Sequence, residues 1–169
     1  MNEGNSERDL DLAHLGPAQL LALHARLGDE LRARGITRSC NNPTGDLAEY
    51  LFCKAFSWKQ IGNSSRNIDA IGSDGTRYQI KGRRMTHYNK SRQLSQIRDL
   101  EDAQFDYLAG VLFNEDYTVM RAAIIPHAVA IEKSTFVKRT NSHKFILRDE
   151  VWDAPEVRDV TPELRAIPL

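Results

Sequence analysis

The stretch FDYLAGVLF, residues 105–113, constrains the fold of this chain more than any other segment. It is nearly continuous apolar sequence, and it is far too short for a helix that crosses a bilayer, which needs about 20 residues. A short apolar run of this kind is typical of a β-strand that is covered on both faces. The stretch therefore predicts a central sheet strand with layers of structure on each side.

The composition agrees with one compact folded unit. The chain has 169 residues, of which 41% are hydrophobic and 27% charged, enough to bury a sizeable core. No apolar stretch is long enough to span a membrane and the first residues do not form a secretion signal, so we expect a cytoplasmic protein with no membrane partner. The only cysteines, Cys40 and Cys53, indicate neither a disulfide framework nor a zinc site.

Hydrophobic spacing predicts the elements around this strand. Four leucines at helical spacing lie between Pro17, suited to a first helical turn, and Gly35, suited to a C-terminal cap: Leu20, Leu23, Leu27 and Leu31. This leucine stripe fits either core packing or a homodimer surface. The further expected helices are a buried one over 45–56, short ones over 126–133 and 161–166, and one through Leu94, Ile97 and Leu100. The further expected strands are 67–71, 77–81, 117–125 and 143–147.

We therefore expect a single α/β domain over residues 1–169. Its central mixed sheet is flanked by helices, and residues 1–15 form a flexible end. The residues that carry the chemistry are expected within 44–132.

Charge is unevenly distributed although the net charge is zero. A balance of 23 basic and 23 acidic residues argues against a chain that coats nucleic acid indiscriminately. However, residues 76–98 contain seven lysines and arginines and no acid, while 149–163 contain six acids. The basic run fits either a solvated face or phosphate contacts.

The hairpin predicted over 67–84 concentrates residues that suit phosphodiester chemistry. Asp69 ends its first strand, and Gln79 and Lys81 lie on one face of the returning strand, so the three side chains can converge. Glu49 shares a helix face with Phe52, which turns its carboxylate toward the protein. Magnesium needs only one or two carboxylates and a carbonyl, and a nearby lysine can orient or activate a water.

These residues resemble the signature of the PD-(D/E)xK nuclease superfamily. The signature appears as GDLAEYL, then NIDAIG, then YQIKGRR, and the apolar strand 105–113 follows where the third core strand of the family would be. The resemblance implies a restriction-endonuclease-like α/β core and a metal-dependent endonuclease that hydrolyses DNA in restriction or repair. It also implies Mg²⁺ as cofactor, with Mn²⁺ as a substitute.

The resemblance implies a role for each site residue. Asp69 would be the principal metal ligand and Glu49 a second carboxylate. Gln79 or the carbonyl of Ile80 would complete the shell, and Lys81 would act on the attacking water. The residues expected to contact the nucleic acid are Arg66, Asn67, Arg83, Arg84, Lys90 and Arg92.

Two departures from the signature keep alternatives open. Ile68 stands where the motif has proline, and Gln79 stands where a carboxylate is usual, which removes one negative charge from the shell. The alternative is a catalytically inactive nucleic-acid-binding module of the same fold, in which Lys81 is the salt-bridge partner of Asp69. RNA is a further candidate substrate, and a homodimer would place one site on each strand of a duplex.

Overall fold

The structure, a computed structural model, describes residues 11–62 and 67–169 and divides into two compact units, 1–40 and 41–169. The first unit holds α1 (Pro17–Ala33), which begins at the expected proline and is followed by Gly35 in the left-handed region (φ 71°). No residue of α1 is buried, and Leu21 is 71% exposed. The helix is confirmed, and the homodimer suggested by its leucines stays a prediction.

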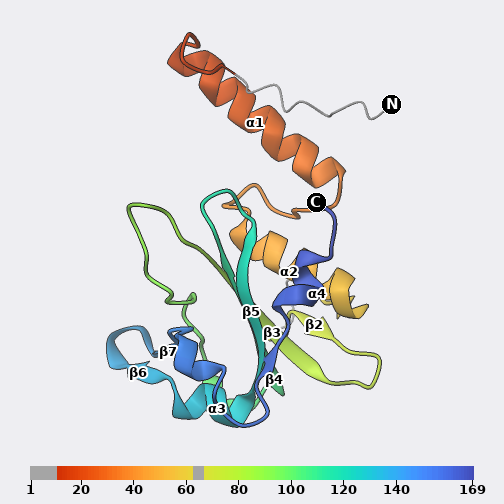
Figure 1. The fold of residues 1–169 in the computed structure, drawn as a ribbon, viewed down its shortest axis with the longest axis vertical. Coiled ribbons are helices and arrows are strands. Elements are labelled where there is room, and N and C mark those ends of the chain that lie inside the picture. The colour runs from red at the N-terminus through yellow and green to blue at the C-terminus, as the bar shows by residue number, and fades with distance from the viewer. Residues whose placement is uncertain (1–10, 63–66) are drawn as a thin grey trace. The chain divides into compact units, whose positions relative to one another are not determined.

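The second unit is built around a six-stranded mixed sheet (Figure 1), with strand order β1-β2-β3-β4-β5-β8. Within it β3 and β4 are parallel and the other neighbours antiparallel, and β6 and β7 form a separate pair. The bounds are α2 (Thr44–Phe56), α3 (His127–Glu132), α4 (Thr161–Arg165), β1 (Lys59–Gln60), β2 (Ala70–Ile71), β3 (Arg77–Arg84), β4 (Tyr107–Phe113), β5 (Val119–Pro126), β6 (Thr135–Val137), β7 (Ser142–Lys144) and β8 (Arg158–Asp159). In the described residues, four helices with this sheet confirm the mixed α/β class.

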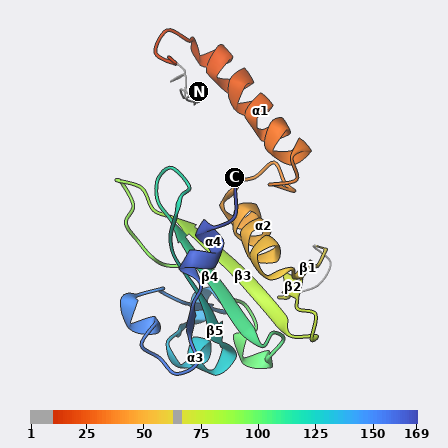
Figure 2. The same cartoon turned by 45° about the vertical axis from the view of Figure 1, so that its right-hand side comes forward.

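The central strand β4 is covered on both faces, as its apolar sequence predicts. Every residue from Leu108 to Phe113 is buried. On one face, α2 packs on β3 so closely that a Cβ at Gly82 would lie 3.0 Å from the Ala48 Cβ. On the other face, a Cβ at Gly110 would meet the side chains of Leu94 and Leu147. Figure 2 shows α2 and α4 together beside the sheet, with α3 near one end of it.

The helix expected through Leu94, Ile97 and Leu100 is wrong. These residues are buried, but residues 93–98 form no helix, and Gln93 and Ile97 form isolated bridges with Ile146 and His143. Leu94 N–H donates to the Phe145 carbonyl, and the backbones of Ile97 and His143 exchange two hydrogen bonds. The backbone groups thus find partners about 50 residues away instead of within a helix. Only Leu100–Asp102 forms a short 3-10 turn.

Two predicted strands are shorter in the structure, and three short strands were not predicted. The first strand of the hairpin is only Ala70–Ile71, so Asp69 lies directly before it, and the last expected strand shortens to β7. The short strands β1, β6 and β8 were not predicted. None of the helices in residues 11–62 and 67–169 is long and apolar enough to span a membrane.

An ion pair joins the starts of the parallel strands β3 and β4. Arg77 donates to both carboxylate oxygens of Asp106, from Nε at 3.2 Å and from Nη2 at 2.8 Å. The hydrogen bond from this guanidinium lowers the pKa of Asp106 below its ordinary value. A carboxyl group whose pKa is lowered by folding stabilises the fold at pH values above its ordinary pKa. This stabilisation is lost as the pH falls through the folded-state pKa.

Replacing Arg77 by methionine is therefore expected to raise the pKa of Asp106 and to cost about 1 kcal/mol of stability at neutral pH. The cost is small because the two side chains are 39% and 40% exposed. Urea unfolding of both proteins from neutral pH down to about pH 3 should show the difference shrinking below about pH 4. Arg98→Met, at an exposed arginine without an ion pair in the described chain, is the control. A difference that stays constant over this range would contradict the assignment.

Candidate functional site

The backbone of Asp69, directly before β2, is hydrogen-bonded to the segments on both sides of it. Its N–H donates to the Tyr78 carbonyl (2.9 Å), and its carbonyl accepts from the Ile61 N–H (2.9 Å). The Asp69 Oδ2 also accepts a hydrogen bond of 2.7 Å from the backbone N–H of Ile80. This bond orients the carboxylate, whose side chain is 25% exposed, and leaves Oδ1 for another partner.

Lys81 lies beside this carboxylate without a direct hydrogen bond. Its Nζ is 3.9 Å from Asp69 Oδ2, whereas a charge-assisted N–H···O bond is about 2.7–2.9 Å long. Both side chains are largely buried, at 19% and 25% exposure. The distance leaves the ammonium protons of Lys81 available to a water molecule next to Asp69.

Gln79 has a buried side-chain oxygen without a hydrogen-bond partner among the described residues. On β3 it lies between Tyr78, whose carbonyl accepts from the Asp69 N–H, and Ile80, whose N–H donates to Asp69 Oδ2. Gln79 is only 3% exposed, and no hydrogen bond within the described chain satisfies its Oε1. A buried acceptor of this kind is costly unless a water or an ion satisfies it.

The carbonyl of Ile80 lies on the same side as Asp69. In an extended strand, the N–H and C=O of one residue point toward the same neighbouring strand. Because the Ile80 N–H reaches Asp69, its carbonyl is directed to the same edge of β3. The structure thus brings Ile80 and Lys81 to Asp69, and the convergence of Gln79 on the same point stays a prediction.

Glu49 on α2 contacts the edge strand β1. It lies on α2, which covers the face that carries Gly82, whereas alternation directs Gln79 and Lys81 to the opposite face. Its Oε2 accepts a hydrogen bond of 2.8 Å from Gln60 Nε2 on the edge strand β1. The role of Glu49 as a metal ligand stays a prediction.

The oxygen donors present fit a magnesium ion. A carboxylate oxygen, a buried amide oxygen and a backbone carbonyl are the donor types that Mg²⁺ accepts, and the ion keeps several waters of its own. The unsatisfied Gln79 Oε1 is the atom that an ion or its water would satisfy. Within residues 11–62 and 67–169, no group of three or more His, Cys, Asp or Glu side chains is arranged to hold a metal.

The arginines after this site are partly engaged by backbone carbonyls. Arg83 donates through Nε to the Ser91 carbonyl, and Arg84 through Nε to the Glu115 carbonyl, with its guanidinium 4.5 Å from the centre of the Tyr117 ring. Each guanidinium has five N–H donors, so both retain donors for a phosphate.

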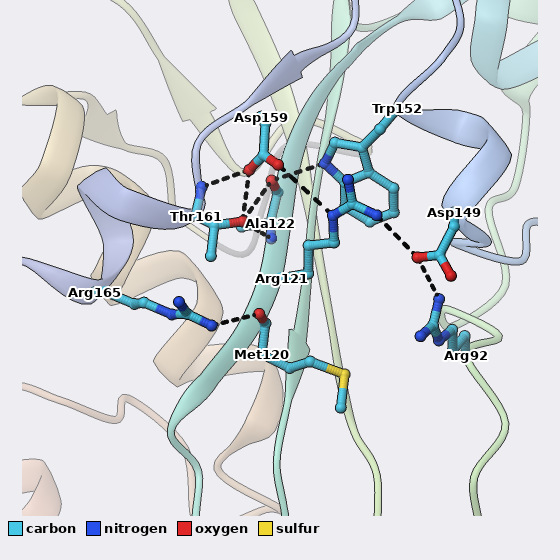
Figure 3. Close-up of polar contacts among 9 residues, drawn as sticks. All are labelled: Arg92, Met120, Arg121, Ala122, Asp149, Trp152, Asp159, Thr161 and Arg165. Carbon is cyan, nitrogen blue, oxygen red and sulfur yellow. Dashed lines mark hydrogen bonds and ion pairs between the residues drawn. The ribbon is translucent and has the colours of Figure 1, made fainter.

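The other residues expected to contact nucleic acid differ in whether their side chains already bind another part of the protein. Lys90 is exposed and has no ion pair in the described chain. Arg92 is bound to Asp149 at 2.8 Å (Figure 3), so its charge is largely offset. Asn67 donates to Asp99 and Gln104, both at 3.3 Å, and Arg66 lies outside the described residues.

Sequence reasoning missed Gln60 as the partner of Glu49. No local signal identifies it, because the contact depends on how α2 lies against β1.

No protein-family model and no curated protein matches the chain. Its function therefore has to be inferred from the residues themselves.

Proposed function

We propose that the chain is a metal-dependent endodeoxyribonuclease of the PD-(D/E)xK type, with its site where the start of β2 meets β3. The observation that carries the proposal is the oriented Asp69 carboxylate beside Lys81 and the unsatisfied Gln79 Oε1. The likeness of NIDAIG and YQIKGRR to the superfamily signature supports it. The expected cofactor is Mg²⁺, with Mn²⁺ as substitute, and the expected substrate is DNA.

In this proposal each residue has one task. Asp69, Gln79 and the Ile80 carbonyl bind the ion, which when bound supplies Lewis-acid stabilisation of the developing charge on phosphate. Lys81 holds the attacking water and its proton next to the Asp69 carboxylate. Arg83 and Arg84 bind neighbouring phosphates and so position the strand, without reading its sequence.

The second candidate is a nucleic-acid-binding module without catalysis. The amide at Gln79 favours it, since the metal shell then has one carboxylate fewer, and so does the proximity of Lys81 and Asp69, which can form an ion pair. A ligand that binds only the folded state raises its stability. Stabilisation by Mg²⁺ or Mn²⁺ is therefore expected for the nuclease and not for the binding module.

The test is cleavage of supercoiled plasmid, of single-stranded DNA and of RNA, with Mg²⁺, Mn²⁺ or EDTA. Metal-dependent cutting of DNA supports the nuclease, and cutting of RNA alone would reassign the substrate. DNA binding at low salt without cutting and without stabilisation by metal would favour the binding module.

Replacing Gln79 by glutamate tests the metal shell directly. The added carboxylate should lower the melting temperature in EDTA, because it is desolvated at a position that is only 3% exposed. It should also tighten Mg²⁺ binding, on the order of tenfold, because each added ligand charge strengthens the site. Differential scanning fluorimetry across a Mg²⁺ series measures both effects. Gln79→Met is the control, which should respond to metal less than the wild type. Equal responses of all three proteins would argue against a metal at Gln79.

A further inference from the structure

A second group of cations lies away from the Asp69 site. Residues 133–148 contain five lysines and arginines and no acid, the same kind of run as 76–98. Three of the five, Lys133, Lys144 and Arg148, line a cavity of about 520 Å³ together with Thr135 and Glu150. A volume of this size is typical of small-molecule sites.

The strand pairing gathers these side chains on one surface. Thr135 on β6 stands directly opposite Lys144 on β7, so their side chains share a face of the pair. Lys133 directly follows α3 and precedes β6 by two residues, and Arg148 lies four residues after the end of β7. Residues separated by up to 15 positions in the chain are thus brought around one hollow.

The three cations have no ion pair or side-chain hydrogen bond within the described chain. Arg77, Arg92 and Arg121, in contrast, are each bound to an aspartate. The acid next to Arg148 is Asp149, and its Oδ1 accepts from both Arg92 and Arg121 (Figure 3). Asp149 is therefore engaged elsewhere, and only Glu150 offsets the charge that lines the cavity.

We propose that this cavity binds a phosphate group. Three cations against one carboxylate leave two positive charges, which match a phosphate, and the Arg148 guanidinium offers paired donors that suit its oxygens. Thr135 supplies a hydroxyl to the same surface. The phosphate belongs either to a free nucleotide or to a nucleic-acid strand, and the chemistry of recognition is the same for both. None of these residues belongs to the Asp69 site, so the proposal does not depend on the nuclease.

The test compares two charge-matched double variants with the wild type. Lys144→Gln with Arg148→Gln removes two cations from the cavity. Lys138→Gln with Arg139→Gln removes two exposed cations that lie between β6 and β7 but do not line it. Titration calorimetry with pyrophosphate and with ATP, and fluorescence anisotropy with a labelled single-stranded oligonucleotide, are carried out in EDTA so that no strand is cut.

Binding should weaken at least about tenfold in the cavity variant and less than about twofold in the control. Binding of pyrophosphate and ATP with this pattern identifies a free phosphate ligand, and the same pattern with the oligonucleotide alone identifies a nucleic-acid phosphate. The proposal is overturned if the wild type binds none of the probes, or if both variants weaken equally. Melting curves check folding, and Lys133→Gln with Arg148→Gln replaces the cavity variant if Lys144 proves necessary for stability.

Discussion

A variant with asparagine in place of Asp69 is expected to cleave DNA about a thousandfold more slowly than the wild type, a loss of the size seen when a group that stabilises transition-state charge is removed. Asparagine keeps the shape of the side chain and an oxygen that can accept from the Ile80 N–H, but it removes the negative charge that we propose binds the ion. The stabilisation by Mg²⁺ should disappear with the activity, because the ion then gains little by binding the folded state.

Lys81→Met is the matched variant for this prediction. It removes the ammonium group 3.9 Å from Asp69 but none of the oxygen donors, so it should lose cleavage and retain the rise in melting temperature with Mg²⁺. Plasmid cleavage and differential scanning fluorimetry on the same preparations separate the two roles. Lys138→Gln, at an exposed lysine with no role in this site, controls for the loss of charge. Cleavage by Asp69→Asn at the wild-type rate would remove Asp69 from the site.

The second prediction is a large loss of folding stability when Gly82, where β3 approaches α2, is replaced by alanine. A Cβ there would lie 2.8 Å from the Thr44 carbonyl oxygen, 3.0 Å from the Ala48 Cβ and 3.3 Å from Phe113. The carbonyl is backbone and cannot rotate away, so Gly82→Ala must separate the strand from the helix. Overpacking of this kind costs about 2 kcal/mol.

Urea unfolding measures this cost. Gly45→Ala is the control, because a Cβ at Gly45 meets no atom within 4 Å and alanine favours the helix by up to about 1 kcal/mol. The two glycine-to-alanine changes should therefore have opposite signs. Equal stability of Gly82→Ala and the wild type would mean that α2 lies further from β3 than described.

Several features of the site follow from local sequence. The apolar run at 107–113 identifies β4, and the alternation of residues along a strand places Gln79 and Lys81 on one face of β3. The turn between Ile71 and Arg77 folds β3 back against β2 and the preceding Asp69, so the hairpin is also predictable. Proline and glycine at the ends of α1 determine its bounds.

Other features depend on contacts between distant segments. Leu94, Ile97 and Leu100 have spacing that suits a helix, but the backbone of Ile97 is hydrogen-bonded to His143 instead of within a helix. Arg92 belongs to a basic run, yet its charge is offset by Asp149, which is 57 residues away. Charge patterns do not reveal which cations are already paired.

The sequence by itself determined the mixed α/β class, the central strand and the β2–β3 hairpin that carries Lys81 next to Asp69, because periodicity and turns act over a few residues. Only the tertiary structure decided the path of 93–100, the partner of Glu49, the burial of Gln79 Oε1 and the cavity lined by Lys133, Lys144 and Arg148. The physical reason is that a backbone or charged group binds the best available partner in space, and tertiary packing brings together partners that are distant in the chain.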